Sequence, residues 1–269
     1  MSGPIGVFDS GLGGLTVLRS MIDLLPREHL IYFGDTGRFP YGPKPAAEVR
    51  AYSVQIGDLL VARGARLLVV ACNSATSAAL ETLQARYDIP VIGVVEPGMR
   101  AAVKVTRSGR IGVIGTVGTI ASGAYQRAAA AARAEIELVC AACPGFVEFV
   151  ENGDVDSEQV HILAERLLAP VADAGVDTLV LGCTHYPLLA RTIADVMGRE
   201  VVLVSSADET AFEVRWTLEA EPYAPRGPAG VPGGHPRREF LTTGDVDTFR
   251  RLGHRFLGPE VDTVTAWSW

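Results

Sequence analysis

The chain has 269 residues, of which 48% are hydrophobic and 20% are charged, and its formal net charge is −7. This length suits one large domain or two of ordinary size, with enough buried surface to fold without disulfide bonds. The acidic balance argues against a nucleic-acid partner, and no apolar run approaches the roughly 20 residues of a membrane span.

The amino terminus and the cysteines indicate a reducing compartment. The first residues, MSGPIGVFDSG, place no basic segment before an apolar stretch, so no secretory signal peptide is expected. Four cysteines in such a chain predict free thiols and a cytoplasmic location. Only Lys44 and Lys104 are lysines, which matters because a pyridoxal enzyme needs a lysine for its Schiff base.

The first hundred residues alternate between strand and helix patterns. Strands are expected at 5–8, 29–33, 67–71 and 90–95. Helices are expected from Leu15 through Ile22, at 48–62 and at 73–87. The stretch 34–45 is dense in Gly and Pro and predicts a loop.

The same alternation then restarts. Helices are expected at 99–105, 122–134, 146–151, 160–174 and 188–197, and strands at 110–114, through Leu138, before Cys183 and at 201–204. The sequence therefore predicts an α/β protein of two pseudo-symmetric domains with mainly parallel sheets and an active site in the cleft between them. We expect residues 1–97 plus 210–269 to form the first domain and 98–209 the second. The segment 222–236 holds five Pro and four Gly and predicts a flexible loop.

Two stretches of the chain read as copies of one another: LLVVACNSAT at 67–76 and TLVLGCTHYP at 178–187. Gly64 lies eight residues before Cys72, and Gly175 lies eight residues before Cys183. A second echo, IGVFDS at 5–10 and IGVIGT at 111–116, comes before each cysteine in the same order. The two matched pairs suggest an internal duplication, in which the two cysteines face each other across one site.

Both cysteines follow a predicted strand, where ligands bind in open α/β sheets, and both precede a predicted helix. Asn73 and Ser74, or Thr184 and His185, are the expected helix caps. The helix amino termini would favour thiolate over thiol and lower the cysteine pKa. A buried cysteine is often only a small hydrophobe, but two equivalent cysteines favour function.

Two opposed thiols allow two kinds of chemistry. They can form a redox-active disulfide, or they can carry protons to and from opposite faces of one carbon atom, which inverts a stereocentre. Asp9 would lie near Cys72 as a proton acceptor or as an anchor for a substrate ammonium group. His185 could hold the proton of Cys183, although a lone histidine is more often a packing residue.

Three other patterns are set aside. The glycines at 11–14 have neither dinucleotide nor Walker spacing, and VFDSG lacks the second acid of an aspartate-nucleophile phosphatase. Cys140 and Cys143 have redox or half-zinc spacing without a second ligand pair nearby, so ordinary cysteines are favoured there.

Six segments together resemble one known family: GVFDSGLGGLTVLR, YFGDTGRFPYGPK, VVACNSATSAAL, IGVIGTVGTI, LVLGCTHYPLL and FLTTGD. They span nearly the whole chain in the order found in the glutamate racemases of the cofactor-independent aspartate/glutamate racemase family. The resemblance implies that Cys72 and Cys183 are the acid/base thiols, that Asp9 assists one, and that His185 with Glu151 assists the other. It also implies a set of substrate-contacting positions: Asp9, Ser10, Tyr41, Gly42, Asn73, Ser74, Thr184 and His185.

The resemblance further implies an isomerase that interconverts L- and D-glutamate, supplies D-glutamate for peptidoglycan, needs no cofactor or metal, and forms a homodimer. Some members of that family bind DNA gyrase, but no segment of this chain indicates such a partner. Two alternatives stay open. One is a racemase for another acidic amino acid such as aspartate, and the other is a non-catalytic regulatory or binding protein on the same fold.

Overall fold

The computed structural model describes residues 3–132, 135–220 and 236–269, which form two parallel sheets. The first sheet has the order β10-β9-β2-β1-β3-β4 and the second the order β6-β5-β7-β8. The first contains β1 (Ile5–Asp9), β2 (Leu30–Gly34), β3 (Leu67–Val70), β4 (Val91–Gly93), β9 (Arg238–Thr242) and β10 (Val264–Ala266). The second contains β5 (Arg110–Gly115), β6 (Glu137–Ala142), β7 (Thr178–Gly182) and β8 (Val202–Ser205).

Helices connect the strands and cover both sheets. The α-helices are α1 (Leu15–Leu24), α2 (Ala46–Ala62), α3 (Asn73–Arg86), α4 (Val95–Val105), α5 (Val117–Ala121), α6 (Ala124–Ala131), α7 (Phe146–Asn152), α8 (Glu158–Asp173), α9 (Ala190–Met197), α10 (Ala207–Glu219) and α11 (Val246–Leu257). Short 3₁₀ helices are η1 (Thr36–Arg38), η2 (Tyr186–Leu189) and η3 (Gly258–Glu260). The α/β architecture predicted from the sequence is confirmed.

Each sheet is apolar on both faces because both faces are covered. In the first sheet, Ile5 and Val7 pack with α1, α10 and α11, whereas Phe8 packs with α2 and α3. In the second sheet, Leu179 packs with α7, α8 and α9, and Val180 packs with α4 and α6. The side-chain alternation of the strands thus builds two cores around each sheet.

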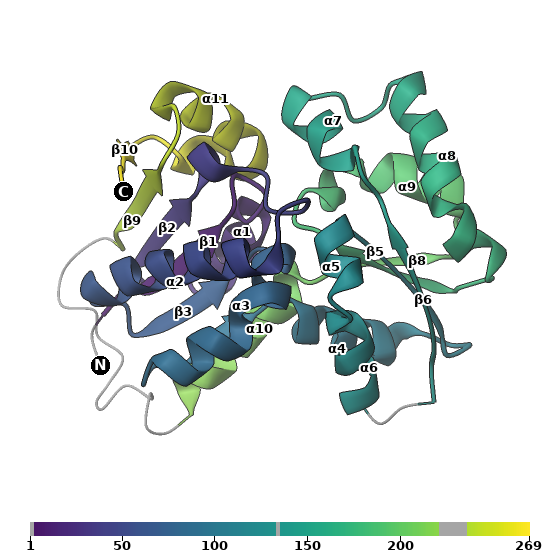
Figure 1. Cartoon of the computed structure of the whole chain (residues 1–269), viewed down its shortest axis with the longest axis horizontal. Coiled ribbons are helices and arrows are strands. Elements are labelled where there is room, and N and C mark those ends of the chain that lie inside the picture. Colours follow the sequence, from purple (N-terminus) through teal and green to yellow (C-terminus); the bar gives the residue numbers. More distant parts are fainter. Residues whose placement is uncertain (1–2, 133–134, 221–235) are drawn as a thin grey trace.

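The carboxy-terminal part of the chain returns to the first sheet. β9 pairs with β2, and β10 pairs with β9, so both extend the sheet that begins with β1. Figure 1 shows this yellow segment beside the purple strands, with the second sheet and its helices forming the other half of the molecule. The division of the chain at residues 97 and 210 stays a prediction.

The two cysteine-bearing units occupy equivalent places. β1 pairs with β3, which leads to Cys72, and β5 pairs with β7, which leads to Cys183. The echo of IGVFDS by IGVIGT therefore corresponds to two central strands with the same neighbour relation.

Several element boundaries differ from the expectation. Helix α4 begins at Val95, earlier than predicted, because Pro97 in its first turn removes an N–H that would have no partner there. The helix expected at 122–134 is α6, which begins at Ala124 directly after Gly123, whose φ is +68°, and a separate short helix, α5, precedes it. Helices α10 and α11 were not predicted, and the loop expected at 222–236 lies outside the described residues except for Pro236.

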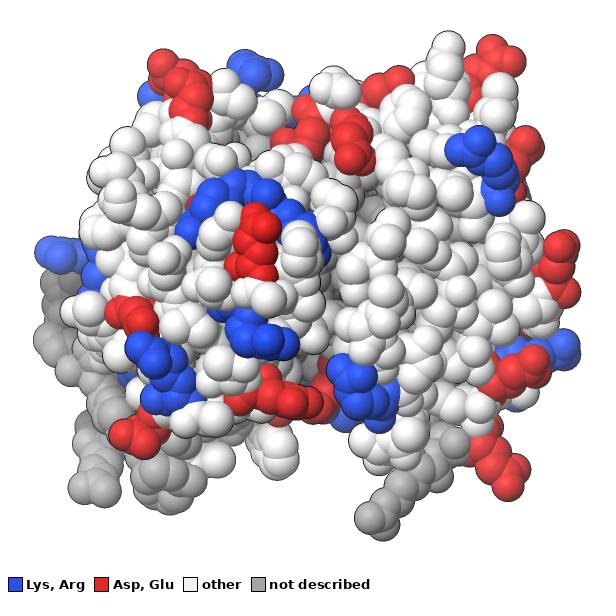
Figure 2. Space-filling view, in the orientation of Figure 1, with Lys and Arg blue, Asp and Glu red and all other residues white. Residues whose placement is uncertain are grey.

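No helix in the described part of the chain is long and apolar enough to cross a membrane. Figure 2 shows lysine and arginine side chains interspersed with aspartate and glutamate on the visible face. Among the described residues, Arg86 forms an ion pair with Asp58 at 2.8 Å. The described charges on this face therefore mix both signs.

Replacing Leu67 of β3 by Ala should destabilise the protein by about 2–5 kcal/mol, because Leu67 is fully buried and its removal leaves a cavity in the first sheet. Trp216→Ala on α10 is the matched control, since Trp216 is 70% exposed, and it should change the free energy of unfolding by no more than about 0.5 kcal/mol. Urea unfolding of both variants checks this. Equal losses in the two variants would contradict the packing described for β3.

Candidate active site

One of the cavities in the described structure is lined by residues that follow the carboxyl ends of β1, β3, β5 and β7, the central strands of the two sheets. Its volume is about 90 Å³, which is small beside the roughly 300–1,000 Å³ of a drug-sized ligand site. It is lined by Ser10, Phe39, Pro40, Tyr41, Gly42, Pro43, Cys72, Asn73, Ser74, Thr116, Val117, Cys143, Pro144, Gly145, Val147, Glu148, Cys183, Thr184 and His185. Both echoed cysteines line the same cavity, one from each sheet.

Cys72 is the N-cap of α3. Its sulfur accepts a hydrogen bond from the Ala75 N–H at 3.4 Å, and its thiol donates to the Ser10 hydroxyl at 3.7 Å. The expectation that Asn73 and Ser74 cap this helix is therefore wrong, because the side chain of the cysteine itself occupies the capping position.

The expected lowering of the Cys72 pKa is also wrong. Burial raises the pKa of the Cys72 thiol, and the neighbouring Asp9 carboxylate raises it further. The Ala75 N–H and the Ser10 hydroxyl act in the opposite direction but do not outweigh burial. The helix amino terminus is present, but loss of solvation dominates, so Cys72 in this structure is a thiol.

Asp9 lies at the end of β1 and is completely buried, behind the lining residues. Its Oδ2 accepts the Gly11 N–H at 2.9 Å, whereas its Oδ1 has no hydrogen-bond partner among the described residues. Burial raises the pKa of Asp9 and outweighs the charge of His185 and the Gly11 hydrogen bond, which act to lower it. The free carboxylate oxygen can accept a proton or bind a cation.

Cys183 lies after β7 in a different local setting. The sequence predicted a helix directly after Cys183, but the chain passes through the 3₁₀ helix η2 before α9 begins at Ala190. Cys183 Sγ lies 3.9 Å from His185 Nδ1, and His185 Nε2 lies 2.7 Å from Glu151 Oε1. The three side chains thus form a line from the cavity to Glu151, which lies behind His185 on α7.

The His185 imidazole is buried and positively charged near neutral pH. Burial lowers its pKa, but the hydrogen bonds and charges of Cys183 and Glu151 outweigh this and raise the pKa to about 10. The rings of Phe39 and Phe256 pack against the imidazole at centroid distances of 5.9 Å and 5.9 Å. The charge of His185 is therefore held in place by two partners and shielded from water by two rings.

Polar groups from both halves of the molecule also meet beside the cavity. The Tyr125 hydroxyl donates to Asn73 Oδ1 at 2.8 Å, while Asn73 Nδ2 has no partner among the described residues. Ser74 Oγ lies 3.0 Å from Thr116 Oγ1, which lies 3.0 Å from Thr119 Oγ1. Asn73 and Ser74 can therefore offer an N–H and an O–H to a ligand.

The loop after β1 comes very close to the second half. A Cβ at Gly13 would lie 2.3 Å from Thr184 Oγ1 and 2.4 Å from His185 Nδ1, so only glycine fits. Thr16 Oγ1 donates to the Thr184 carbonyl at 3.4 Å. These contacts bring the loop after β1 against the Cys183 side of the cavity.

The cavity assembles nine of the predicted site residues: Ser10, Tyr41, Gly42, Cys72, Asn73, Ser74, Cys183, Thr184 and His185. Asp9 and Glu151 lie one layer behind and reach the cavity through Cys72 and His185. Thr116 was missed, although its position in IGVIGT matches that of Ser10 in IGVFDS. Cys143 was set aside as an ordinary cysteine, but it lines the cavity and is 1% exposed, whereas Cys140 does not line it.

The charges of the lining limit what the cavity can hold. Among the described residues that line it, none is Lys or Arg, so no lysine is available there for a Schiff base. No group of three His, Cys, Asp or Glu in the described part of the chain is arranged to hold a metal ion. A ligand carboxylate in this cavity would be bound by neutral N–H and O–H groups and by His185.

Comparisons with known proteins agree with one another. A family model described as Asp/Glu/hydantoin racemase matches residues 5–212. The glutamate racemase of Acidothermus cellulolyticus is 55% identical over 97% of this chain and 98% of its own length. The crystal structure of glutamate racemase from Bacillus anthracis is 41% identical, with a TM-score of 0.92 and coverage of 99% and 97%. The Francisella tularensis glutamate racemase, solved in complex with D-glutamate, is 31% identical, with a TM-score of 0.91 and coverage of 99% and 98%.

The pKa of His185 can be measured by ¹⁵N NMR of labelled histidine. We expect the His185 imidazole to titrate near pH 10 and to titrate at lower pH in Glu151→Gln, because this variant removes the charge that stabilises the imidazolium. A pKa of His185 that stays the same in Glu151→Gln would contradict the role of this pair.

The same shift predicts how stability depends on pH. The folded pKa of His185 lies above the ordinary value of 6.5. The contribution of His185 to the free energy of unfolding is therefore complete below about pH 6.5 and is lost as the pH rises through about 10.

Proposed function

This chain belongs to the Asp/Glu/hydantoin racemase family and is an amino-acid racemase, and on that premise we propose that it interconverts L- and D-glutamate by proton transfer between two thiols. The observation that carries the proposal is the pair Cys72 and Cys183, which line one cavity from two equivalent strand ends, each with its own acid/base partner.

The two partners give the thiols different starting states. Cys72 has a raised pKa and begins as a thiol, the acid. His185 Nδ1 lies 3.9 Å from Cys183 Sγ and is placed to take its proton, so we assign Cys183 the role of base. For one enantiomer, Cys183 takes the α-proton, the electron pair of the C–H bond moves into the carboxylate, and Cys72 donates its proton to the opposite face. For the other enantiomer, the protonation states are exchanged, with the free Oδ1 of Asp9 as acceptor for the Cys72 proton.

The intermediate carries extra negative charge on its carboxylate. Donors that already point at this group stabilise the transition state, and each is worth roughly 3–4 kcal/mol when removed from such sites. Asn73 Nδ2, which has no partner among the described residues, and the hydroxyls of Ser74 and Thr184 are the donors we assign to the substrate carboxylates. The ammonium group of the substrate would then bind near Asp9.

Glutamate is the substrate favoured by the comparisons. The relatives that match nearly the full length of this chain are glutamate racemases, and the Francisella tularensis enzyme binds D-glutamate. We place the reaction in the cytoplasm because the four cysteines of the chain are all free thiols. There its D-glutamate would enter peptidoglycan synthesis. Assembly as a homodimer stays a prediction, and no described feature indicates a DNA gyrase partner.

The test is racemisation in deuterated water without added pyridoxal phosphate. Solvent deuterium should enter the α-carbon of glutamate, and glutamate should be racemised faster than aspartate. Cys72→Ala and Cys183→Ala should each lower kcat/KM by at least about 100-fold, because each removes one of two acid/base groups.

Cys140→Ala is the matched control, since Cys140 is a half-buried cysteine outside the cavity, and it should keep wild-type activity. Normal turnover in either active-site variant would rule out the two-thiol mechanism. Faster turnover of aspartate would leave the mechanism intact and change the substrate. No turnover of any acidic amino acid by the wild type would favour a binding protein on this fold.

A further inference from the structure

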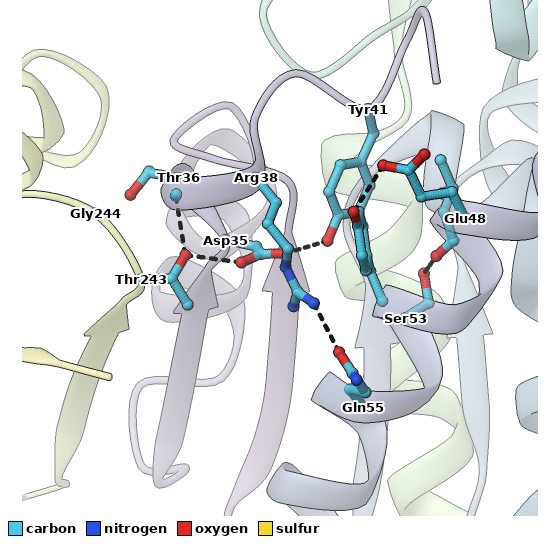
Figure 3. A network of polar contacts seen from close by, with 12 residues as sticks. Asp35, Thr36, Arg38, Tyr41, Glu48, Ser53, Gln55, Thr243 and Gly244 are labelled. Atoms are coloured by element: carbon cyan, nitrogen blue, oxygen red, sulfur yellow. Dashed lines mark hydrogen bonds and ion pairs between the residues drawn. The ribbon is translucent and has the colours of Figure 1, made fainter. Parts of the chain in front are cut away.

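The loop that follows β2 carries a buried carboxylate, Asp35, which lies outside the cavity and bonds Tyr41, one of the residues that line it. Asp35 is completely buried, and its N–H donates to the carbonyl of Asp9 at 3.0 Å. Its Oδ2 accepts hydrogen bonds from Arg38 Nε at 2.7 Å and from the Tyr41 hydroxyl, and its Oδ1 accepts from Thr243 Oγ1 at 2.7 Å. A carboxylate this deep in a protein requires such partners, and Figure 3 shows them converging on it.

Tyr41 is the member of this network that lines the cavity. A phenol has one hydrogen to donate, and Tyr41 directs it to Asp35. Burial and the Asp35 charge raise the pKa of Tyr41, so the phenol keeps this hydrogen. Its hydroxyl is therefore not available as a donor to substrate, although Tyr41 was expected to contact substrate. What Tyr41 offers to the cavity is its ring and its backbone.

The next residue in the loop is held from the other half of the molecule. The Gly42 carbonyl accepts the Gly118 N–H at 3.0 Å, and a Cβ at Gly42 would lie 2.8 Å from the Cβ of Thr116. Because Tyr41, Gly42 and Pro43 form one wall of the cavity and Thr116 lies against them, a small movement of Tyr41 changes the width of the cavity. Errors of about 1 Å in such walls can cost a large part of an enzyme's activity.

Residues from the end of the chain hold Asp35 on its outer side. Thr243 follows β9, and its hydroxyl also accepts the Gly37 N–H at 2.9 Å. The Arg38 guanidinium lies over the rings of Tyr52 and Trp269, at 4.0 Å and 4.6 Å from their centroids. The carboxy-terminal segment thus contacts both Asp35 and Arg38, which places it in the support of a loop some 200 residues earlier in sequence.

We propose that Asp35 is a positioning residue, which holds the Tyr41–Pro43 wall of the cavity through the Tyr41 hydroxyl and is itself held by Arg38 and Thr243. This role rests on the proposed glutamate racemase activity, because it concerns how the substrate is bound there. Asp35 touches no substrate in this scheme and acts only through Tyr41.

Steady-state kinetics of Tyr41→Phe, Asp35→Asn and the double variant test the proposal. Tyr41→Phe keeps the ring and removes the hydrogen bond to Asp35. KM for both enantiomers should therefore rise about tenfold with little change in kcat, which is the pattern of lost substrate binding. Asp35→Asn should do the same. KM of the double variant should be no higher than the higher KM of the two single variants, because both changes remove the same interaction. If the two changes acted independently, their effects on KM would add as free energies.

Two further variants keep the test decisive if Asp35→Asn folds poorly. Thr243→Val removes a support of Asp35 far from the cavity and should raise KM in the wild-type background but not in Tyr41→Phe. Tyr52→Phe is the matched control, because the Tyr52 hydroxyl bonds Glu48 at 2.6 Å and does not line the cavity, so KM should stay at its wild-type value.

The outcomes separate the two levels of inference. Wild-type turnover of glutamate together with an unchanged KM in Tyr41→Phe overturns the positioning role and leaves the racemase activity standing. Additive effects in the double variant also overturn it. A wild type that does not racemise glutamate contradicts the proposed function itself.

Discussion

The removal of water from ionisable groups is the constraint on which this site depends. Asp9, Cys72 and His185 are all buried around one small cavity, and burial opposes the charged form of each. A charge persists there only where a specific partner opposes the loss of solvation. Glu151 provides that partner for His185, whereas Cys72 has no cation beside it and stays protonated. The protonation pattern of the site is therefore set by which partner each half supplies.

This difference between the halves is notable because their backbones are arranged alike. Equivalent strands lead to Cys72 and Cys183, yet the first cysteine caps a helix next to a carboxylate and the second precedes a 3₁₀ helix next to an imidazolium. A reaction that moves a proton across one carbon atom needs one group that holds a proton and one that lacks it. In the proposed mechanism, the different partners of the two cysteines would supply that difference before substrate arrives.

Much of the fold and of the site could be predicted from the sequence. The buried strands and the paired cysteines were readable because strand ends in parallel sheets meet at one edge, and echoed segments keep equivalent positions. Helix α10 was missed in part because exposed Phe212 and Trp216 obscure its apolar face, whereas α11 carried a usable signal in Asp245, which caps it. The direction of the Cys72 pKa was wrong because the depth of burial, unlike helix position, is not written in the local sequence. The Asp35 network was not predicted because it joins residues some 200 positions apart.

The lack of lysine and arginine among the described lining residues also governs how an anion reaches the cavity. The protein carries a net charge of −7, and none of the described lining residues is a lysine or arginine that could draw an anionic ligand inward. Long-range attraction therefore does not guide diffusion toward this mouth, and capture depends on short contacts made after encounter. A higher ionic strength would screen the repulsion between the acidic protein and an anionic ligand, so the association rate constant would rise. The buried N–H and O–H contacts are screened little by salt, so the lifetime of the complex would stay nearly constant.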